Sequence, residues 1–409
     1  MSERHDTVVV GAGHAGLALS KLLGERDIEH VVLERGRVAE RWRSERWDSF
    51  TLLTPNWATW LPGWRYDGPE PDGFMSREQV VDYLERFGRS FDAPVREGVE
   101  VQSLEAANGD GYRLRTADGE LLARSVVLAT GPFQAPRLPA WAAALPPEIL
   151  QLHSSGYRGP AQLPEGAVLV VGTGASGQQI AEDLLRGGRR VYLSVGRHRR
   201  VPRRYRERDY FRWLEQGGYY ERTAADVPLA QRRRGVSPAL TGFGGGHDLD
   251  LRRLHADGAT LLGRALGAAD GRLQLADGLL PSLAEGDRAY DDFAAWVESR
   301  LGRFEPPFAE PAERERLPDP PEPPAELDLR EAGIAAVVWA TGFRSELDRW
   351  VKLPVLDADG EPVQDRGVTA SPHLYFLGLH WLHRLRSAFI RGAEEDAGHV
   401  AALIAGARS

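Results

Sequence analysis

Residues 7–16 of the chain are Thr-Val-Val-Val-Gly-Ala-Gly-His-Ala-Gly, and this stretch decides the fold. The β-branched run Thr7–Val10 is typical of a buried strand, and Leu17–Leu23 after it predicts a helix. The first glycine permits a tight turn, the second lets the backbone approach a pyrophosphate, and the third lets the helix pack close to the strand. They are Gly11, Gly13 and Gly16. Because the amide groups at such a helix N-terminus bind phosphate, the stretch predicts a dinucleotide site.

A second apolar run, His30–Leu33, supports this prediction because it ends in an acid. Glu34 stands 18 residues after the last glycine, about where a carboxylate grips a ribose diol. A glycine pattern alone would be weak evidence for a dinucleotide site. The evidence is strong here because the glycines lie between a predicted strand and a predicted helix, and because an acid ends the next strand.

The same pattern recurs in the middle of the chain. Ala167–Val171 is a second apolar run, residues 172–177 are Gly-Thr-Gly-Ala-Ser-Gly, and Gln178–Leu185 predicts a helix. The next expected strand, Arg190–Val195, is followed by Arg197 rather than by an acid. A guanidinium binds a 2′-phosphate, whereas a carboxylate repels it. The first site therefore suits a free ribose diol and the second suits NADP(H).

Arg197 begins an arginine-rich run that ends at Arg208. Such a run is usually a solvated face or a nucleic-acid patch. Its position directly after the strand favours a nucleotide phosphate site, which needs only one or two of the arginines.

Composition excludes several classes of protein. The chain has 409 residues, 42% of them hydrophobic, so two domains are expected. A net charge of −8 argues against a general nucleic-acid binder. No apolar run approaches the roughly 20 residues of a membrane span, and the polar start has no signal-peptide pattern, so a cytoplasmic location is expected. The absence of cysteine excludes disulfides, thiolate metal sites and dithiol redox chemistry.

Several further elements follow from local patterns. Ser76 caps an amphipathic helix that reaches Phe87, and Asp118-Gly119 predicts a hairpin. Further expected elements are a strand over Val95–Leu104, a helix over Ala289–Leu301, an extended strap over Glu305–Pro324 and a final helix over Ser387–Ile404. Residues 210–247 are expected to form irregular surface or a lid. The tryptophans between Trp42 and Trp64 form either an aromatic wall or the packing of an irregular subdomain.

The predicted fold is α/β, with two Rossmann-like domains and the second inserted in the first. The expected division is an FAD-binding domain over 1–160 and 331–409, and an NADPH-binding domain over 161–330 that carries an insertion around 205–247. This is the layout of an FAD enzyme reduced by a nicotinamide nucleotide. Without cysteines or a visible metal-ligand cluster in the sequence, the simplest electron acceptor is dioxygen.

The chain resembles class B flavin-dependent monooxygenases, namely bacterial flavoproteins related to the YUCCA-type and microsomal-type enzymes. The motifs that carry the resemblance are Gly11–Gly16, Glu34, Arg41-Trp42, Ala129-Thr130-Gly131, His153 with Tyr157, Gly172–Gly177 and Ala340-Thr341-Gly342-Phe343.

The resemblance implies roles for individual residues. Those expected to hold FAD are Gly11, Gly13, Gly16, Glu34, Arg35, Arg41, Trp42, Thr54, Val101, Thr130 and Gly131. Those expected to hold NADPH are Gly172, Gly174, Ser176 and Arg197. His153, in a segment that crosses between the halves, suits a hinge or orienting role.

Two further roles concern the flavin ring. Asn56 matches the context of an asparagine that lies near the flavin in related enzymes, where its amide would hydrogen-bond the peroxide; the alternative is a turn residue after Pro55. The start of the last helix, near Arg386 and Ser387, would point a positive dipole at the flavin pyrimidine and stabilise the reduced ring by about 1 kcal/mol.

The function implied is an NADPH-driven monooxygenase that uses O2 and a flavin hydroperoxide to oxygenate a nitrogen, sulfur or carbonyl centre of a small molecule. The alternative is an NAD(P)H oxidase or quinone reductase with the same cofactors and no oxygen transfer. No metal, nucleic acid or membrane span is expected, and a homodimer is a further expectation.

Overall fold

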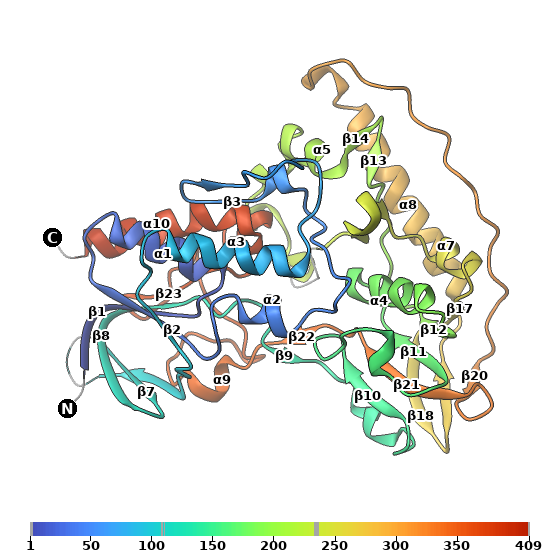
Figure 1. The fold of residues 1–409 in the computed structure, drawn as a ribbon, viewed down its shortest axis with the longest axis horizontal. Helices are drawn as coiled ribbons and strands as arrows, with labels where there is room; N and C mark the ends of the chain where they lie inside the picture. The colour runs from blue at the N-terminus through green and yellow to red at the C-terminus, as the bar shows by residue number, and fades with distance from the viewer. Residues whose placement is uncertain (1–2, 108, 110, 233–236, 408–409) are drawn as a thin grey trace.

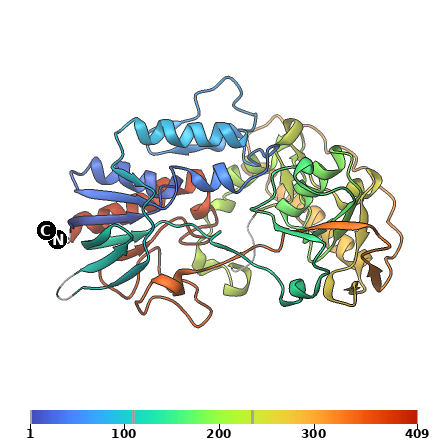
Figure 2. The same cartoon turned by 60° about the horizontal axis from the view of Figure 1, so that its bottom comes forward.

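The computed structural model describes residues 3–107, 109, 111–232 and 237–407. It contains two α/β units that lie side by side, each built on its own sheet (Figures 1 and 2). The α/β class predicted from the sequence is therefore confirmed.

The first unit holds a seven-stranded sheet in the order β5-β2-β1-β8-β7-β6, with β23 paired to β8. Its strands are β1 (Glu3–Val10), β2 (His30–Glu34), β5 (Val95–Glu97), β6 (Ser103–Ala106), β7 (Tyr112–Thr116), β8 (Gly119–Leu128) and β23 (Leu374–Phe376). The helices α1 (His14–Gly24), α3 (Arg77–Arg89) and α10 (Ala393–Gly406) share one hydrophobic core with these strands. Valines 8–10 are buried because β1 lies between parallel neighbours β2 and β8 and is covered by helices.

The second unit holds a fully parallel five-stranded sheet in the order β10-β21-β11-β12-β17. Its strands are β10 (Leu150–His153), β11 (Ala167–Val171), β12 (Val191–Ser194), β17 (Thr260–Leu262) and β21 (Ile334–Trp339). Every residue of β11 is buried. The helices α4 (Ala175–Arg186), α7 (Leu251–Ala256) and α8 (Leu279–Glu298) belong to this half (Figure 1). A small antiparallel sheet, β18 (Ala265–Ala269), β19 (Arg272–Leu275) and β20 (Glu326–Asp328), adjoins it.

The strand pairing corrects the expected division of the chain. β10 lies within the range 1–160 and β21 within 331–409, yet both pair in the second sheet. An apolar run shows that a strand is buried but not which sheet it joins, since that is decided by pairing between distant segments. The second sheet therefore takes strands from Leu150 to Trp339, and the chain returns to the first sheet at β23.

Two crossing segments connect the sheets, and they pair with each other. β9 (Ala135–Pro136) is antiparallel to β22 (Phe343–Arg344). The rings of Phe133 and Phe343 meet edge to face, with centroids 5.2 Å apart. The His153 imidazole lies within 2.9 Å of the Gly342 carbonyl oxygen. These contacts agree with the orienting role expected for His153.

A second connection comes from the segment after α2 (Glu40–Ser44). Trp47 is buried in the core of the second unit, beside Tyr157. Asp183 on α4 accepts hydrogen bonds from the Tyr157 hydroxyl at 2.7 Å and from the Ser49 hydroxyl at 2.5 Å. The Asp183 carboxylate thus joins Ser49, from the segment after α2, to Tyr157, from the core of the second unit.

Three expected elements have different bounds. The strand expected over 95–104 is two strands, β5 and β6, because Gly98 adopts φ +74° between them. The helix expected from Ala289 begins at Leu279, since Pro281 occupies its first turn, where no amide donor is needed. The final helix begins at Ala393 rather than at Ser387.

The region expected as irregular surface or a lid contains short elements that pack. They are α5 (Tyr210–Gln216), α6 (Leu229–Arg232) and the strands β15 (Leu240–Thr241) and β16 (His247–Asp248). Phe211, Trp213 and Tyr220 form a core with Phe293 of α8 and Trp381. The strap 305–324 has no helix or strand, as expected, and runs along the outside of α8 (Figure 1).

Replacing Trp47 by alanine tests the second connection. Loss of a buried tryptophan is expected to cost about 3 kcal/mol or more of unfolding free energy, because the cavity opens in the core of the neighbouring unit. Thermal unfolding measures it. Leu229→Ala is the control, since Leu229 is 53% exposed. An equal and small change in both variants would contradict the connection.

Candidate functional site

The first glycine turn joins β1 to α1 and leaves open space at one glycine. Gly11 has φ +109°, and a Cβ there would lie 2.7 Å from the Ala129 carbonyl oxygen. A Cβ on Gly16 would lie 1.9 Å from the carbonyl oxygen of Gly11. Nothing lies within 4 Å of a Cβ built on Gly13. Two glycines thus allow backbone contact inside the protein, and the middle one leaves room for a ligand at the start of α1.

The second turn, between β11 and α4, repeats this geometry. Gly172 also has φ +109°, and its Cβ would lie 2.5 Å from the Ala340 carbonyl oxygen. A Cβ on Gly177 would lie 1.9 Å from the Gly172 carbonyl oxygen, whereas that on Gly174 would meet nothing within 4 Å. Ser176 is exposed in the first turn of α4. The structure therefore contains two equivalent cradles, each at the carboxyl end of a central parallel strand.

The strand ends beside the two cradles differ in charge. The Glu34 carboxylate accepts hydrogen bonds from the amides of Ala12 at 2.8 Å and Gly36 at 2.9 Å, so it lies at the rim of the first glycine turn. Val99 donates its amide to the Glu34 carbonyl oxygen at 2.9 Å, which brings the stretch that contains Val101 to the same edge. Arg35 is exposed beside it.

The arginine run after β12 divides into two groups. Five of its seven arginines have partners. Arg200 pairs with Asp248 and Asp250, Arg203 with Asp209, and Arg206 with Glu298. Arg204 and Arg208 donate hydrogen bonds to carbonyl oxygens. Arg197 and Arg199 are exposed, and neither has an ion pair or a side-chain hydrogen bond to another described residue. Within the described part of the chain, these two guanidinium groups have no polar side-chain partner, and both follow the end of β12.

Arg41, Thr130 and Gly131 come together at the first crossing segment. The Arg41 guanidinium donates to the carbonyl oxygens of Phe133 and Gln134 and pairs with Glu45 at 2.8 Å. The Gln134 amide in turn donates to the Thr130 hydroxyl at 3.0 Å and to the Gly131 carbonyl oxygen at 3.1 Å.

Trp42 packs against the first core, with its ring 6.0 Å from that of Phe50 and under the guanidinium of Arg46. Burial lowers the pKa of Arg46 to about 10. Of the two interpretations of the tryptophan-rich region, internal packing describes Trp47 and Trp64, which contact Phe50 and Tyr83 respectively.

Asn56 is 2% exposed, and its amide fastens a loop. Its nitrogen donates to the Glu70 carbonyl oxygen at 2.9 Å, and its oxygen accepts from the Met75 amide at 2.9 Å. Thr54 is half-buried two residues before it. These contacts show a loop-holding role of the kind the turn alternative describes, and the catalytic role of Asn56 stays a prediction.

The predicted helix dipole near Arg386 and Ser387 is wrong. Both residues lie in a 3-10 turn, Leu385–Ala388, where the Ser387 hydroxyl accepts from the amides of His383 and Arg384. The apolar spacing continued through this turn and concealed the break. α10 begins at Ala393, and its first turn carries three acids, Glu394, Glu395 and Asp396. Their negative charges offset the positive partial charge at the N-terminus of the helix. Burial raises the pKa of Asp396 to about 6.

Two half-buried histidines, His14 and His380, lie near the first cradle and were not predicted as site residues. Burial lowers the pKa of His14 and of His380 to about 4, so both are neutral at physiological pH. The Ala388 backbone lies against His14, and a Cβ on Gly378 would lie 2.8 Å from that of Ala15. The loop 378–388 therefore covers the start of α1. The sequence signal that could have indicated a role for His14 in the site is its position inside the glycine motif.

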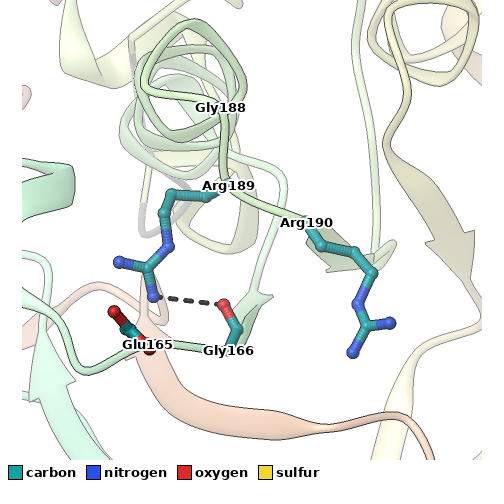
Figure 3. Close-up of a pocket in the computed structure, with 5 residues that line it drawn as sticks. All are labelled: Glu165, Gly166, Gly188, Arg189 and Arg190. Atoms are coloured by element: carbon teal, nitrogen blue, oxygen red, sulfur yellow. Dashed lines mark hydrogen bonds between the residues drawn. The ribbon is translucent and has the colours of Figure 1, made fainter.

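One described cavity is separate from both cradles. It has a volume of 440 Å³ and is lined by Glu165, Gly166, Gly188, Arg189 and Arg190 (Figure 3). These residues precede β11 and β12, so they lie at the amino ends of the strands, whereas ligands of such sheets bind at the carboxyl ends. The Arg189 guanidinium is already bonded to the carbonyl oxygen of Gly166 at 3.1 Å (Figure 3).

Within the described ranges, no helix has the length and apolarity needed to cross a membrane. The same residues contain no cluster of three or more His, Cys, Asp or Glu side chains arranged to hold a metal ion.

Comparisons with known proteins identify the class. The sequence matches the pyridine nucleotide-disulphide oxidoreductase family over residues 8–215, and the chain belongs to this family. An uncharacterized oxidoreductase, CzcO-like, from Geobacillus kaustophilus (strain HTA426) is 32% identical over 398 residues, which cover 97% of each protein. The chain is thus an oxidoreductase, although without cysteine it has no dithiol of its own.

Two further relatives carry the monooxygenase resemblance. The indole-3-pyruvate monooxygenase YUCCA1 of Oryza sativa subsp. japonica is 34% identical over 202 residues, 47% of this chain and 49% of that protein. A flavin-containing monooxygenase from Stenotrophomonas maltophilia has the same fold, with a TM-score of 0.67, 20% identity and full coverage of both chains. The resemblance to class B flavin-dependent monooxygenases predicted from the sequence is confirmed.

The second and third glycines of the first turn, Gly13 and Gly16, offer a matched pair of variants. Gly16→Ala is expected to destabilise the protein by about 2 kcal/mol or more, because its Cβ would overlap the Gly11 carbonyl oxygen. Gly13→Ala is expected to leave the melting temperature of the ligand-free protein unchanged, since the added methyl group meets open space. Differential scanning calorimetry compares them. Equal destabilisation would contradict the assigned geometry.

Proposed function

We propose that the chain is an NADPH-driven FAD monooxygenase, with FAD in the cradle at Gly11–Gly16 and NADPH in the cradle at Gly172–Gly177. The observation that carries the proposal is the duplicated turn beside strand ends of opposite charge. A carboxylate at Glu34 suits the free ribose diol of FAD, and a guanidinium at Arg197 suits a 2′-phosphate. The proposed FAD domain is built on the first sheet, and the NADPH domain, β10 to β21, is inserted in it.

The residues present fit these ligands. The open space at Gly13 and Gly174 allows a pyrophosphate to approach the amides at the starts of α1 and α4. Glu34 already accepts two amide hydrogen bonds at the rim, so its carboxylate is oriented before a ribose arrives. We assign Arg35, Arg41, Trp42, Thr54, Val101, Thr130 and Gly131 to the surroundings of FAD, and Ser176 and Arg197 to NADPH.

In the proposed reaction, NADPH, a proton, O2 and a small-molecule substrate yield NADP⁺, water and the oxygenated substrate. The bound flavin supplies the hydride acceptance and the reaction with dioxygen. The chain supplies the positions: paired segments β9 and β22 connect the two cradles, and Asp183 joins the units at a second point. His14 lies within the first glycine turn and His380 in the loop that covers the start of α1, and the lowered pKa of each keeps both uncharged at neutral pH.

The absence of cysteine supports oxygen transfer over disulfide reduction, because no dithiol in the chain can accept the electrons. The second candidate is an NAD(P)H oxidase or quinone reductase, which requires the same two cradles. The candidates differ in the electron acceptor and product: the monooxygenase gives an oxygenated substrate and water, the oxidase gives hydrogen peroxide, and the quinone reductase gives a quinol.

Replacing Arg197 or Arg199 by alanine tests the second cradle. Each change is expected to raise the KM for NADPH about tenfold, because a charge-assisted hydrogen bond to the 2′-phosphate is lost. The KM for NADH is expected to stay the same, since NADH lacks this phosphate. Arg204→Ala is the control, because Arg204 donates to the carbonyl oxygens of Gly245 and Gly246. An equal effect on both nucleotides would argue against the assignment.

Labelled dioxygen separates the two candidate functions. Purified, FAD-loaded protein is incubated with NADPH, ¹⁸O₂ and a panel of amines, sulfides, ketones and aromatic acids. If the protein is a monooxygenase, one product is expected to contain one labelled oxygen atom, and the amount of NADPH consumed is expected to equal the amount of product formed. Hydrogen peroxide in equal amount to NADPH consumed, with no labelled product from any compound, would favour the oxidase.

A further inference from the structure

The side chain of Arg203 connects the arginine run of the second unit to the first unit. Arg203 precedes β13 (Arg204–Tyr205) and is 2% exposed. One terminal nitrogen of its guanidinium donates to the carbonyl oxygen of Leu53 at 2.6 Å, and the other pairs with the Asp209 carboxylate at 2.8 Å. Asp209 lies on β14, the partner strand of β13, whereas Leu53 lies between α2 and α3 of the first unit. One buried cation therefore contacts both units.

A second contact with the first unit is aromatic. The guanidinium carbon of Arg203 lies 4.2 Å from the ring centroid of Phe74 and 5.6 Å from that of Phe211. Phe74 stands two residues before Ser76, the cap of α3, and so belongs to the first unit. A buried guanidinium over a ring is attracted by the ring quadrupole as well as by packing. Arg203 thus holds the first unit at one polar and one aromatic point.

Both points of contact belong to one segment of the first unit, residues 52–75. The ends of this segment are already joined, since the Leu52 amide donates to the Met75 carbonyl oxygen at 2.8 Å. The Asn56 side chain also accepts from the Met75 amide at 2.9 Å. Arg203 contacts one residue near each end of the segment, so it fastens the segment from the side of the second unit.

The chain that supplies Arg203 also borders the second cradle. Arg197 and Arg199, the exposed arginines assigned to the 2′-phosphate, stand six and four residues before it. Between them and Arg203, the Arg200 guanidinium is held by the Asp250 carboxylate at 2.8 Å. One anchored stretch of chain therefore leads from the proposed NADPH site to the segment that carries Thr54, which we assign to the surroundings of FAD.

The cost of burying this ion pair indicates that its value is directional. Desolvation lowers the pKa of Arg203 and raises that of Asp209. A buried ion pair adds little net stability, because desolvation of the two charges offsets their attraction, and apolar side chains of similar volume avoid that cost. What a guanidinium adds is a rigid set of donors in fixed directions. Here those directions define the position of Leu53 relative to Asp209.

We propose that Arg203 is a positioning residue for the transfer of a hydride from NADPH to the bound flavin. It fixes segment 52–75, with Thr54 and Asn56, relative to the stretch of chain that holds the nicotinamide nucleotide. This inference rests on the proposed function, because only a reaction between two cofactors requires the two sides to keep one alignment. Arg203 contacts neither cofactor in this assignment and acts through Leu53 and Phe74.

Hydrogen–deuterium exchange of the oxidised, FAD-loaded protein tests the positional role without turnover. Arg203→Lys keeps the charge opposite Asp209, but one ammonium group cannot also bond Leu53 and lie flat on Phe74. The backbone amides of segment 52–75 are expected to exchange about tenfold faster in this variant, whereas those of β1 and β11 are unchanged. Unchanged exchange in the segment, or equally faster exchange in both sheets, overturns the proposal.

Anaerobic stopped-flow mixing with NADPH measures the consequence for the reaction. Arg203→Lys is expected to lower the rate constant of flavin reduction about tenfold and to leave the Kd for NADPH unchanged, because alignment is lost and the exposed arginines are intact. Phe74→Leu removes the ring on the side of the first unit and is expected to lower the same rate constant severalfold. This second variant keeps the test decisive if Arg203→Lys does not fold.

Arg206→Lys is the matched control for both measurements. Arg206 belongs to the same arginine run, but it pairs with Glu298 of α8 at 2.7 Å and not with the first unit. Its exchange pattern and its rate constant are expected to equal those of the wild type. A rate constant of flavin reduction that is unchanged in Phe74→Leu and in a folded Arg203→Lys overturns the proposal.

Failure of this inference is distinguishable from failure of the proposed function. Flavin reduction by NADPH in the wild-type protein, with the same rate constant in every variant, rejects the role of Arg203 alone. No flavin reduction in the wild-type protein rejects the NADPH-driven function, and the positioning role is rejected with it, whatever the exchange measurement shows.

Discussion

The structure depends on a close backbone contact that is made twice. In each unit the third glycine of the turn lies so near the carbonyl oxygen of the first that a Cβ would be 1.9 Å away. This contact lets a helix start directly over the end of the central strand. The amides of its first turn then point away from the protein, where only a ligand or water can accept from them. Gly13 and Gly174 keep that space open.

The two cradles act together only if the units hold a defined orientation. Two features fix it: the pairing of β9 with β22, and the insertion of Trp47 into the core of the second unit. The first lies between the carboxyl-end loops that follow β8 and β21. The second fastens residues near α2 to Asp183 on α4, the helix of the second cradle. Burial of a large aromatic ring is worth several kcal/mol, so this connection resists separation more strongly than surface ion pairs do.

Much of the fold was predictable from the sequence because the decisive signals are local. Gly11–Gly16 and Gly172–Gly177 fix strand, turn and helix within a dozen residues, and Ser76 marks the start of α3 with a capping box. The membership of β10 and β21 in the second sheet was not predictable, since pairing joins segments more than 150 residues apart. The break before α10 was missed because the apolar spacing runs through it.

The residues of the candidate site also divide into those that local sequence signals could place and those that depend on contacts between distant segments. Glu34 could be placed from its distance to the last glycine, and its contacts at the rim of the turn agree with that position. The position of Arg391 against Trp60 and Tyr220 could not be predicted, because the three residues come from distant segments and each is unremarkable in its own stretch. The lowered pKa of His14 and of His380 comes from desolvation in the folded protein, which the sequence does not display.

The central claim is that one chain holds FAD and NADPH in two equivalent cradles that exchange electrons. The most direct measurement is an anaerobic titration of the purified, FAD-loaded protein with NADPH, followed by the visible absorbance of the flavin. The account predicts complete bleaching at one equivalent of NADPH per flavin, and a weaker response to NADH. Protein that binds no flavin, or flavin that stays oxidised in excess NADPH, would contradict it.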